Sequence, residues 1–379
     1  MRFPRFSDPW KKFALGDIGT SLIGLTYSPN DVVQENGIIV LRSSNIQEGA
    51  LDFNDVVRVS KKIRPSLFTQ EEDILICSRN GSARLIGKNA IIPKSYSGLT
   101  FGAFMMVYRS NQNRFIHHLL NTKRYQTQVS ENLGARINQI TSSDLNSFEF
   151  FFPCEKEQNK IAKFIDLIDE RIATQRRLIE DLEKLKSSII DRCYRGNNNL
   201  RLGEFISQVS QRNRANHPYK VMSVSNVRGF VPQSEQFSDR EIASENTTSY
   251  KIVTKEIFAY NPARINIGSI ARFNGSDKGI VSPMYICFKV EGELQPKYLE
   301  YFFQTRRFKN DVELRLEGSV RLCLNFDALC EIEIPILSPA EQITISSAIE
   351  TLCNKIVLER KVLSNMDNQR KYLLSNLFM

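Results

Sequence analysis

The chain contains the opening of the same helix twice. The stretch PCEKEQNKIAKFIDLIDERI at 153–172 and the stretch SPAEQITISSAIETLCNKI at 338–356 both pass a proline and reach Glu-Gln. Each then places an apolar residue every three or four positions, which is typical of one face of a helix. The two Glu-Gln pairs lie about half of the 379-residue chain apart. Such a repeat constrains the fold more than any other feature, because each copy is expected to form an equivalent unit.

Four further matches follow in the same order along the chain. Residues 15–17 match 202–204, and 44–46 match 225–227. FMMVY at 104–108 matches YICFK at 285–289, and 115–125 match 298–308. The offset between the copies drifts by only a few residues, as short loop insertions would cause. The chain is therefore predicted to consist of two similar halves.

Each half begins with a globular part, at about 13–153 and 200–337, in which short apolar runs alternate with loops rich in Gly, Asn and Ser. β-Branched and aromatic residues favour strands at 73–78, 104–109, 148–152, 285–290 and 331–336. One amphipathic helix is predicted in each part, the second beginning near Pro296. The predicted fold class is mixed α/β (α+β). The predicted segments are a domain at 1–153, a long helix at 154–197, a second domain at 198–337 and a second long helix at 338–379.

Apolar residues recur alternately four and three apart along both long helices, which is the seam of a coiled coil. The predicted seam consists of Ile161, Ile165, Ile168, Ile172, Ile179, Leu182, Ile189, Ile345, Ile349, Leu352, Ile356, Leu363, Met366 and Leu373. Polar residues interrupt both copies at the same places: Gln175 corresponds to Glu359, and Lys186 corresponds to Arg370. The simple arrangement is an antiparallel pair with a pseudo-twofold axis. The alternative is two ordinary surface helices, each packed on its own domain.

The composition agrees with a soluble globular protein, at 41% hydrophobic and 25% charged residues. Neither a membrane-spanning apolar run nor an N-terminal secretory signal is visible, and the seven cysteines form no CxxC pair. We therefore expect a cytoplasmic protein with free thiols. The formal net charge of +9 favours a polyanionic partner, although only weakly.

At this point the sequence resembles the specificity subunit of type I restriction–modification enzymes. The residues that carry the resemblance are FALGDIG at 13–19, RSSNI at 42–46, YNPARINIGSIA at 260–271 and the Glu-Gln helix entry used twice. The resemblance implies that each globular part reads one half of a split double-stranded DNA target. It also implies that the long helices set the spacing between the half-sites and dock two adenine methyltransferase subunits, with restriction (translocase) subunits joining them. S-adenosylmethionine, ATP and Mg²⁺ would then belong to those partners, and this chain would bind no cofactor and catalyse nothing.

Motifs for catalysis are few. The sequence has neither GxGxxG after a strand nor a Walker A loop, and its three histidines lack metal-ligand spacing. NPAR at 261–264 matches only the first half of an adenine methylase motif. Two other classes of function remain open: a solo DNA methylase or nuclease, and a coiled-coil scaffold that binds other proteins.

Arg reads guanine and Asn or Gln reads adenine in the major groove, with help from Ser. Side chains of these types gather in corresponding loops of the two halves, and turn-forming or solvated loop residues are the alternative for each. The predicted DNA-binding residues are Ser44, Asn45, Arg79, Asn80, Ser82, Arg84, Arg136, Asn138, Gln139, Ser225, Asn226, Arg264, Asn266, Arg272, Asn274 and Arg321. Because the halves differ at these positions, the DNA target is expected to be asymmetric.

The Glu-Gln pairs at the two helix entries are candidates for partner docking. They are Glu157, Gln158, Glu341 and Gln342. The alternative is that these side chains cap the helix N-terminus and complement its dipole.

Overall fold

The computed structural model describes residues 2–133, 138–196, 198–236, 246–318 and 321–378. The chain forms two compact units: unit 1 is Met1–Gln175 with Val362–Met379, and unit 2 is Arg176–Lys361. The long helices are α5 (Glu155–Cys193) and α10 (Pro339–Leu377), both 39 residues long. Each unit therefore contains one globular part together with a portion of both long helices, a division that differs from the four segments predicted from the sequence.

Two four-stranded sheets form the centre of unit 1. The first has the order β2 (Thr20–Ile23), β11 (Met105–Arg109), β8 (Ile74–Cys77) and β9 (Asn89–Ile91), with antiparallel neighbours. Every residue of β8 is buried, which explains its continuous apolar run. The second sheet has the order β10 (Thr100–Phe101), β4 (Ile38–Leu41), β7 (Val57–Val59) and β3 (Val32–Val33). Two-stranded pairs join β1 (Lys11–Ala14) to β12 (Glu149–Phe152) and β5 (Ile46–Gln47) to β6 (Ala50–Leu51).

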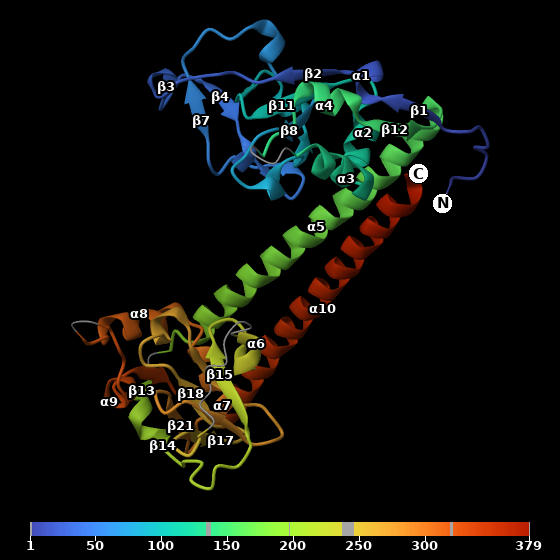
Figure 1. Ribbon diagram of the computed structural model, residues 1–379. Coiled ribbons are helices and arrows are strands. Elements are labelled where there is room, and N and C mark those ends of the chain that lie inside the picture. The colour runs from blue at the N-terminus through green and yellow to red at the C-terminus, as the bar shows by residue number, and fades with distance from the viewer. Residues whose placement is uncertain (1, 134–137, 197, 237–245, 319–320, 379) are drawn as a thin grey trace. The chain divides into compact units, whose positions relative to one another are not determined.

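The helices of unit 1 are α1 (Leu15–Ile18), α2 (Asn113–Leu119), α3 (Lys123–Asn132) and α4 (Ser142–Ser147). Figure 1 shows α2 and α3 beside the beginning of α5, and one apolar core joins them. The core contains Phe115 of α2 and Ile161 of α5, together with Leu374 and Leu377 of α10. The beginning of α5 thus packs with the end of α10, which makes the two helices antiparallel within this unit.

Unit 2 repeats this plan. One sheet has the order β14 (Ile206–Val209), β21 (Ile286–Val290), β18 (Phe258–Tyr260) and β19 (Ile270–Arg272). The other has the order β16 (Gly229–Pro232), β15 (Lys220–Ser225), β20 (Gly279–Val281) and β17 (Lys251–Val253). β13 (Asn199–Arg201) pairs with β22 (Glu333–Pro335), as β1 pairs with β12. The helices are α6 (Gln233–Gln236), α7 (Pro296–Phe302), α8 (Arg306–Leu314) and α9 (Phe326–Cys330).

The predicted mixed α/β fold with an internal repeat is confirmed. β2, β11, β8 and β9 occur in the same order as β14, β21, β18 and β19, and in each unit a parallel pair (β10–β4 or β15–β20) sits in the second sheet. The expectation of one amphipathic helix in each globular part is wrong, because the segment is broken into α2 and α3 and into α7 and α8. Thr122 and Thr305 cap the second helix of each pair by accepting a hydrogen bond from a backbone N–H three residues on, which fixes the break.

The predicted seam residues point inward along both long helices. Every one of them is buried or partly buried. In unit 2, Ile189 and Ile190 of α5 share a core with Ile345 and Ile349 of α10, so the later part of α5 packs with the beginning of α10. The paired, antiparallel arrangement holds in this unit as well, which argues against two unconnected surface helices.

The seven cysteines are free thiols. A search of the described residues finds no helix whose length and apolar character would let it cross a membrane.

Candidate nucleic-acid interface

Four loops of unit 1 meet at one end of its sheets. They are the 3-10 turn Ser43–Asn45 after β4, the loop after β8, the residues before β11 and the residues before α4. Asn80 Nδ2 donates to Ser43 Oγ at 3.1 Å, and the Asn80 amide donates to the Asn138 carbonyl at 3.2 Å. The Arg79 amide donates to the carbonyl of Phe104 at 3.1 Å. Backbone and side-chain hydrogen bonds therefore hold these loops as one surface.

We call this surface the first loop cluster, and it comprises Ser43, Arg79, Asn80, Gly81, Ser82, Phe104, Asn138 and Gln139. Asn138 Nδ2 donates to the Gly81 carbonyl at 3.0 Å, and a β-bridge joins Arg79 to Gln139. Arg79 and Ser82 are exposed, as is Arg84 in the adjoining turn Ala83–Leu85. The structure thus brings most of the predicted residues of this half together. The prediction for Arg136 falls outside the described residues.

Asn45 is a correction to the prediction. Its side chain is fully buried; Nδ2 donates to the carbonyls of Asp52 and Asp55, and Oδ1 accepts from the Arg42 amide. Both amide hydrogens and the amide oxygen of Asn45 therefore form hydrogen bonds within the loop. Because the side chain is also buried, it stabilises the loop and does not contact a base. The hydroxyl oxygen of neighbouring Ser44 is also buried.

Corresponding loops meet in unit 2. The Leu324 amide donates to the Pro262 carbonyl at 3.0 Å, which joins the loop before α9 to the loop after β18. Ser269 Oγ donates to the Val224 carbonyl at 2.8 Å, and the Val224 amide donates to the hydroxyl oxygen of Tyr285 at 3.3 Å. These loops enclose a pocket of about 570 Å³. We define the second loop cluster as its polar and exposed lining: Asn261, Arg264, Ser282, Met284 and Arg321.

Arg264 and Arg321 are both exposed, and both line this pocket. Asn226 and Asn266 are exposed on neighbouring turns. Ser225 Oγ accepts hydrogen bonds from the amides of Val227 and Arg228, so it closes a turn. Among the described residues, the second loop cluster therefore presents Arg264 and Arg321, whereas the first presents Arg79 among several amides, with Arg84 in the adjoining turn.

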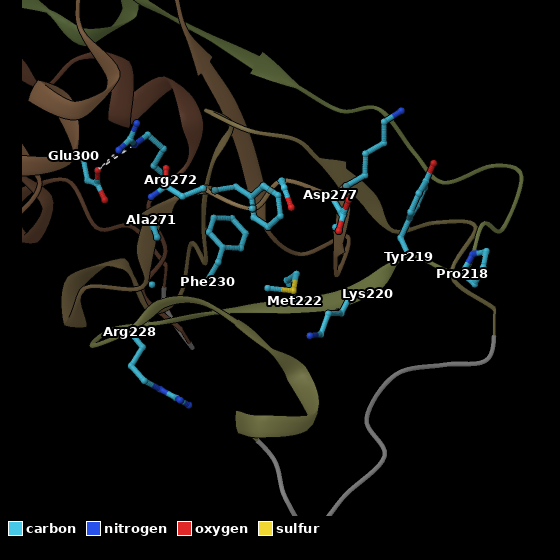
Figure 2. A pocket seen from close by; sticks show the side chains of 17 residues that line it. Pro218, Tyr219, Lys220, Met222, Arg228, Phe230, Ala271, Arg272, Asp277 and Glu300 are labelled. Atoms are coloured by element: carbon cyan, nitrogen blue, oxygen red, sulfur yellow. Dashed lines mark hydrogen bonds and ion pairs between the residues drawn. The ribbon is translucent and has the colours of Figure 1, made fainter.

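A second pocket of about 660 Å³ in unit 2 contains the other predicted residues (Figure 2). Arg272 is a correction: its side chain is only 10% exposed and is held by two carboxylates. Nε and Nη2 donate to Glu300 Oε2 at 3.0 and 2.8 Å, and Nη1 donates to Glu256 Oε2 at 2.7 Å. Burial lowers the pKa of Arg272, but the hydrogen bonds and charges of the two glutamates raise it overall. Arg272 therefore ties β19 to α7, whereas Asn274 stays exposed in the lining of this pocket, apart from the second loop cluster.

The predicted docking residues are mostly buried, which is a further correction. Glu157 has no exposed side-chain area and accepts from Arg2 Nε and Nη2 at 2.9 and 2.8 Å. Gln158 donates to the Pro153 carbonyl, and the fully buried Gln342 donates to the Leu337 carbonyl. These three residues cannot form an exposed docking surface.

Glu341 alone of the four is exposed, and it accepts hydrogen bonds from the Ser338 amide and hydroxyl. These hydrogen bonds lower the pKa of its carboxyl. The capping interpretation therefore accounts for Glu341, since it occupies the reciprocal position of a capping box.

The exposed ring of Phe104, in the first loop cluster, was not predicted from the sequence. Phe104 reads as the first residue of the strand predicted at 104–109, but β11 begins at Met105 and the Phe104 side chain is exposed. Nothing in an apolar pattern distinguishes a ring that faces solvent from one that enters the core. Within the described residues no group of three or more His, Cys, Asp or Glu side chains could hold a metal ion.

Comparison with known proteins finds a family model that matches the first part of the chain. Residues 7–184 match the family model described as the type I restriction modification DNA specificity domain. The specificity subunit of the type I restriction enzyme StySPI from Salmonella potsdam is 25% identical over 189 residues, which cover 48% of this chain and 41% of that protein. The chain thus matches about two fifths of the length of this curated relative.

Two solved structures share the fold along nearly the whole chain. One, from a study of complex assembly and conformational transition of the type I R-M system, has a TM-score of 0.61 at 15% identity and covers 98% of this chain and 97% of its own. The other is the S subunit of the type I restriction–modification system from M. genitalium, with a TM-score of 0.56 at 18% identity, covering 100% and 97%. At these identities the likeness shows the fold alone. The resemblance noted in the sequence is confirmed: residues 7–184 match the model of the type I restriction modification DNA specificity domain, and the curated relative and both solved structures come from type I restriction systems.

Proposed function

We propose that this chain is the DNA-reading specificity subunit of a type I restriction–modification system. The observation that carries the proposal is that the same four loops converge in both units and present different polar side chains. Asn80 and Asn138 belong to the first loop cluster, and Arg264 and Arg321 to the second. Each unit would read one half of a split double-stranded target, and the two half-sites would differ.

The chemistry of the exposed side chains supports DNA as the ligand. Arginine recognises guanine through two hydrogen bonds, and asparagine does the same for adenine. The loops that carry them are fixed by internal hydrogen bonds, so little order is lost on binding. The net charge of +9 favours a phosphate backbone through counterion release.

The catalytic steps are assigned to other subunits in this proposal. Two adenine methyltransferase subunits would bind S-adenosylmethionine, and restriction (translocase) subunits would bind ATP and Mg²⁺. This chain would supply recognition and act in the cytoplasm. The sequence supports the assignment because it carries neither a Walker A loop nor a complete adenine methylase motif.

The test is to co-express the chain with a methyltransferase partner of a type I system and map methylated adenines across a genome by single-molecule sequencing. The expected result is one split motif with two different half-sites and a methylated adenine in each. A continuous, unsplit motif would refute the two-reader proposal, and methylation by the chain alone would support the solo-enzyme alternative.

Variants in the two loop clusters sharpen this test. Arg264→Ala should relax or weaken recognition of one half-site, at a cost of about 1–3 kcal/mol for one lost bidentate contact. Asn80→Ala should act on the other half-site only. If both variants altered the same half-site, the assignment of one reader to each unit would be wrong.

A further inference from the structure

The first loop cluster presents a phenylalanine to solvent. The Phe104 side chain is 58% exposed, although its neighbours Gly102 and Met105 are buried. Arg79 lies over the ring, and Asn80 and Asn138 belong to the same loop cluster. An aromatic ring set among hydrogen-bonding side chains is an arrangement suited to a ligand with both flat apolar faces and polar edges, such as a nucleobase.

The backbone that carries this ring is held firmly. The Phe104 carbonyl accepts three hydrogen bonds, from the Ser78 amide at 3.0 Å, from Ser78 Oγ at 3.0 Å and from the Arg79 amide at 3.1 Å. The Arg79 guanidinium lies over the ring, 5.0 Å from its centre. Because the carbonyl is fixed and a cation covers one face, the ring is positioned before any ligand arrives.

Unit 2 provides an internal comparison. Tyr285 directly precedes β21 as Phe104 precedes β11, so the two residues are counterparts in the repeat. Tyr285 is only 8% exposed, and its hydroxyl oxygen accepts from the Val224 amide of β15. Its carbonyl accepts from Lys251 Nζ at 2.6 Å. The aromatic ring therefore belongs to the core in unit 2 and to the surface in unit 1.

A pocket of about 850 Å³ adjoins Phe104 in unit 1. Tyr27 and Met105 contribute apolar lining, and Arg42, Ser43 and Ser44 contribute polar groups. A base displaced from the stack could enter this pocket beside the ring without displacing core residues.

We propose that Phe104 stacks against a base of the half-site read by unit 1 and unstacks one base step there. This inference rests on the proposed function and adds a distortion of the DNA confined to one half-site. Apolar side chains act in this way when they wedge between base steps. Tyr285, the counterpart of Phe104, should not stack against a base of the half-site read by unit 2, because its ring is held inside the fold.

The test uses the full chain with its methyltransferase partner and duplexes that carry the mapped target. 2-Aminopurine replaces one adenine at a time in either half-site, except the two methylated adenines, because a methyltransferase itself takes its target base out of the stack. The fluorescence of 2-aminopurine rises when it loses its stacking partner. The expected result is a several-fold rise on binding at one position of the first half-site and none in the second. Phe104→Ala should abolish the rise and weaken binding at least about fivefold, the low end for loss of one stacking contact.

Ile23→Ala is the matched control, because Ile23 is an exposed apolar residue of the same unit outside the first loop cluster. It should leave both the fluorescence and the affinity unchanged. If the wild-type protein binds the target specifically and Phe104→Ala gives the same fluorescence and affinity, the stacking inference is wrong while the proposed function stands. If the wild-type complex fails to distinguish the target from unrelated DNA, the proposed function itself fails.

Discussion

Arg370 of α10 donates two hydrogen bonds to the carboxylate of Asp169 of α5, from Nη2 to Oδ2 at 3.0 Å and from Nε to Oδ1. Both side chains are partly buried in unit 1. The sequence marks Arg370 as a polar interruption of the seam, and the structure shows the residue with which it pairs. Such a pair within an apolar seam favours one register of the two helices over others.

Breaking this pair should destabilise unit 1. Asp169→Ala leaves a half-buried guanidinium without its carboxylate, and we expect a loss of about 1–2 kcal/mol in the free energy of unfolding measured by urea denaturation. The double variant Asp169→Arg with Arg370→Asp should recover part of the loss.

Glu183→Ala is the control for the Asp169 variant. Glu183 accepts from Arg360 Nη2 at 2.5 Å, but both side chains are more exposed. Since solvent screens such a pair, the loss should stay below about 0.5 kcal/mol. Equal losses for the two variants would contradict a special role for the Asp169–Arg370 pair.

We predict that Gln342 stabilises the fold and does not dock a partner subunit. Its Oε1 accepts from the Gln295 amide at 2.8 Å, and its Nε2 donates to the carbonyls of Leu337 and Glu293 at 2.8 and 3.3 Å. Gln342→Ala leaves these partly buried backbone groups without their partner and should cost about 1–3 kcal/mol in thermal or urea unfolding. Gln158→Ala, at the same position of the repeat, should cost less, because its Oε1 meets no donor within the described residues. A stable Gln342→Ala protein that merely lost a partner subunit would restore the docking interpretation.

Arg272 should affect stability and leave base preference unchanged. Arg272→Met would leave Glu256 and Glu300 without their shared cation, and we expect about 1–3 kcal/mol of destabilisation. The methylated motif should remain the same at permissive temperature. Asn274→Ala in the same pocket is the control and should leave stability within about 0.5 kcal/mol. A changed motif in a stably folded Arg272→Met protein would show that Arg272 reads DNA after all.

Acid should destabilise unit 1 through His117. Burial, together with the nearby charges of His118 and Arg370, lowers the pKa of His117 from 6.5 to about 3, and Asp166 opposes this only partly. Between these values the unfolded chain binds a proton at His117 that the folded chain does not. Stability is therefore complete above about pH 6.5 and falls as the pH drops toward 3, by about 1.4 kcal/mol per pH unit from this residue.

The measurement is urea denaturation between pH 7 and pH 4.5. His117→Leu should flatten the dependence on pH, whereas His217→Gln, at an exposed position, should leave it unchanged. A wild-type slope unaffected by His117→Leu would assign the acid sensitivity to other groups. Asp166 is the first to examine: burial raises the pKa of its carboxyl, but the hydrogen bond to His118 and nearby positive charges lower it overall.

The sequence alone determined the repeat, the mixed α/β class and the two long helices with their inward-facing stripes. These follow from local periodicity, which the chain expresses before any tertiary contact forms. Even the polar interruptions at Gln175 and Arg370 were visible, because they fall in phase with the seam. The split of one predicted helix into α2 and α3 was missed, although Thr122, which caps the N-terminus of α3, stands in the sequence at the break.

The tertiary structure decided what each polar side chain does. Asn45 and Asn80 are the same residue type in neighbouring loops, yet Asn45 is fully buried with both amide hydrogens donated to backbone carbonyls. Asn80 is only partly buried, and its Nδ2 donates to Ser43 Oγ while its Oδ1 accepts from the Ser82 amide. Phe104 and Tyr285 directly precede matching strands, yet only Phe104 faces solvent. Burial and hydrogen-bond partners come from segments far apart in the chain, so residue type and spacing cannot reveal whether a side chain is engaged or available.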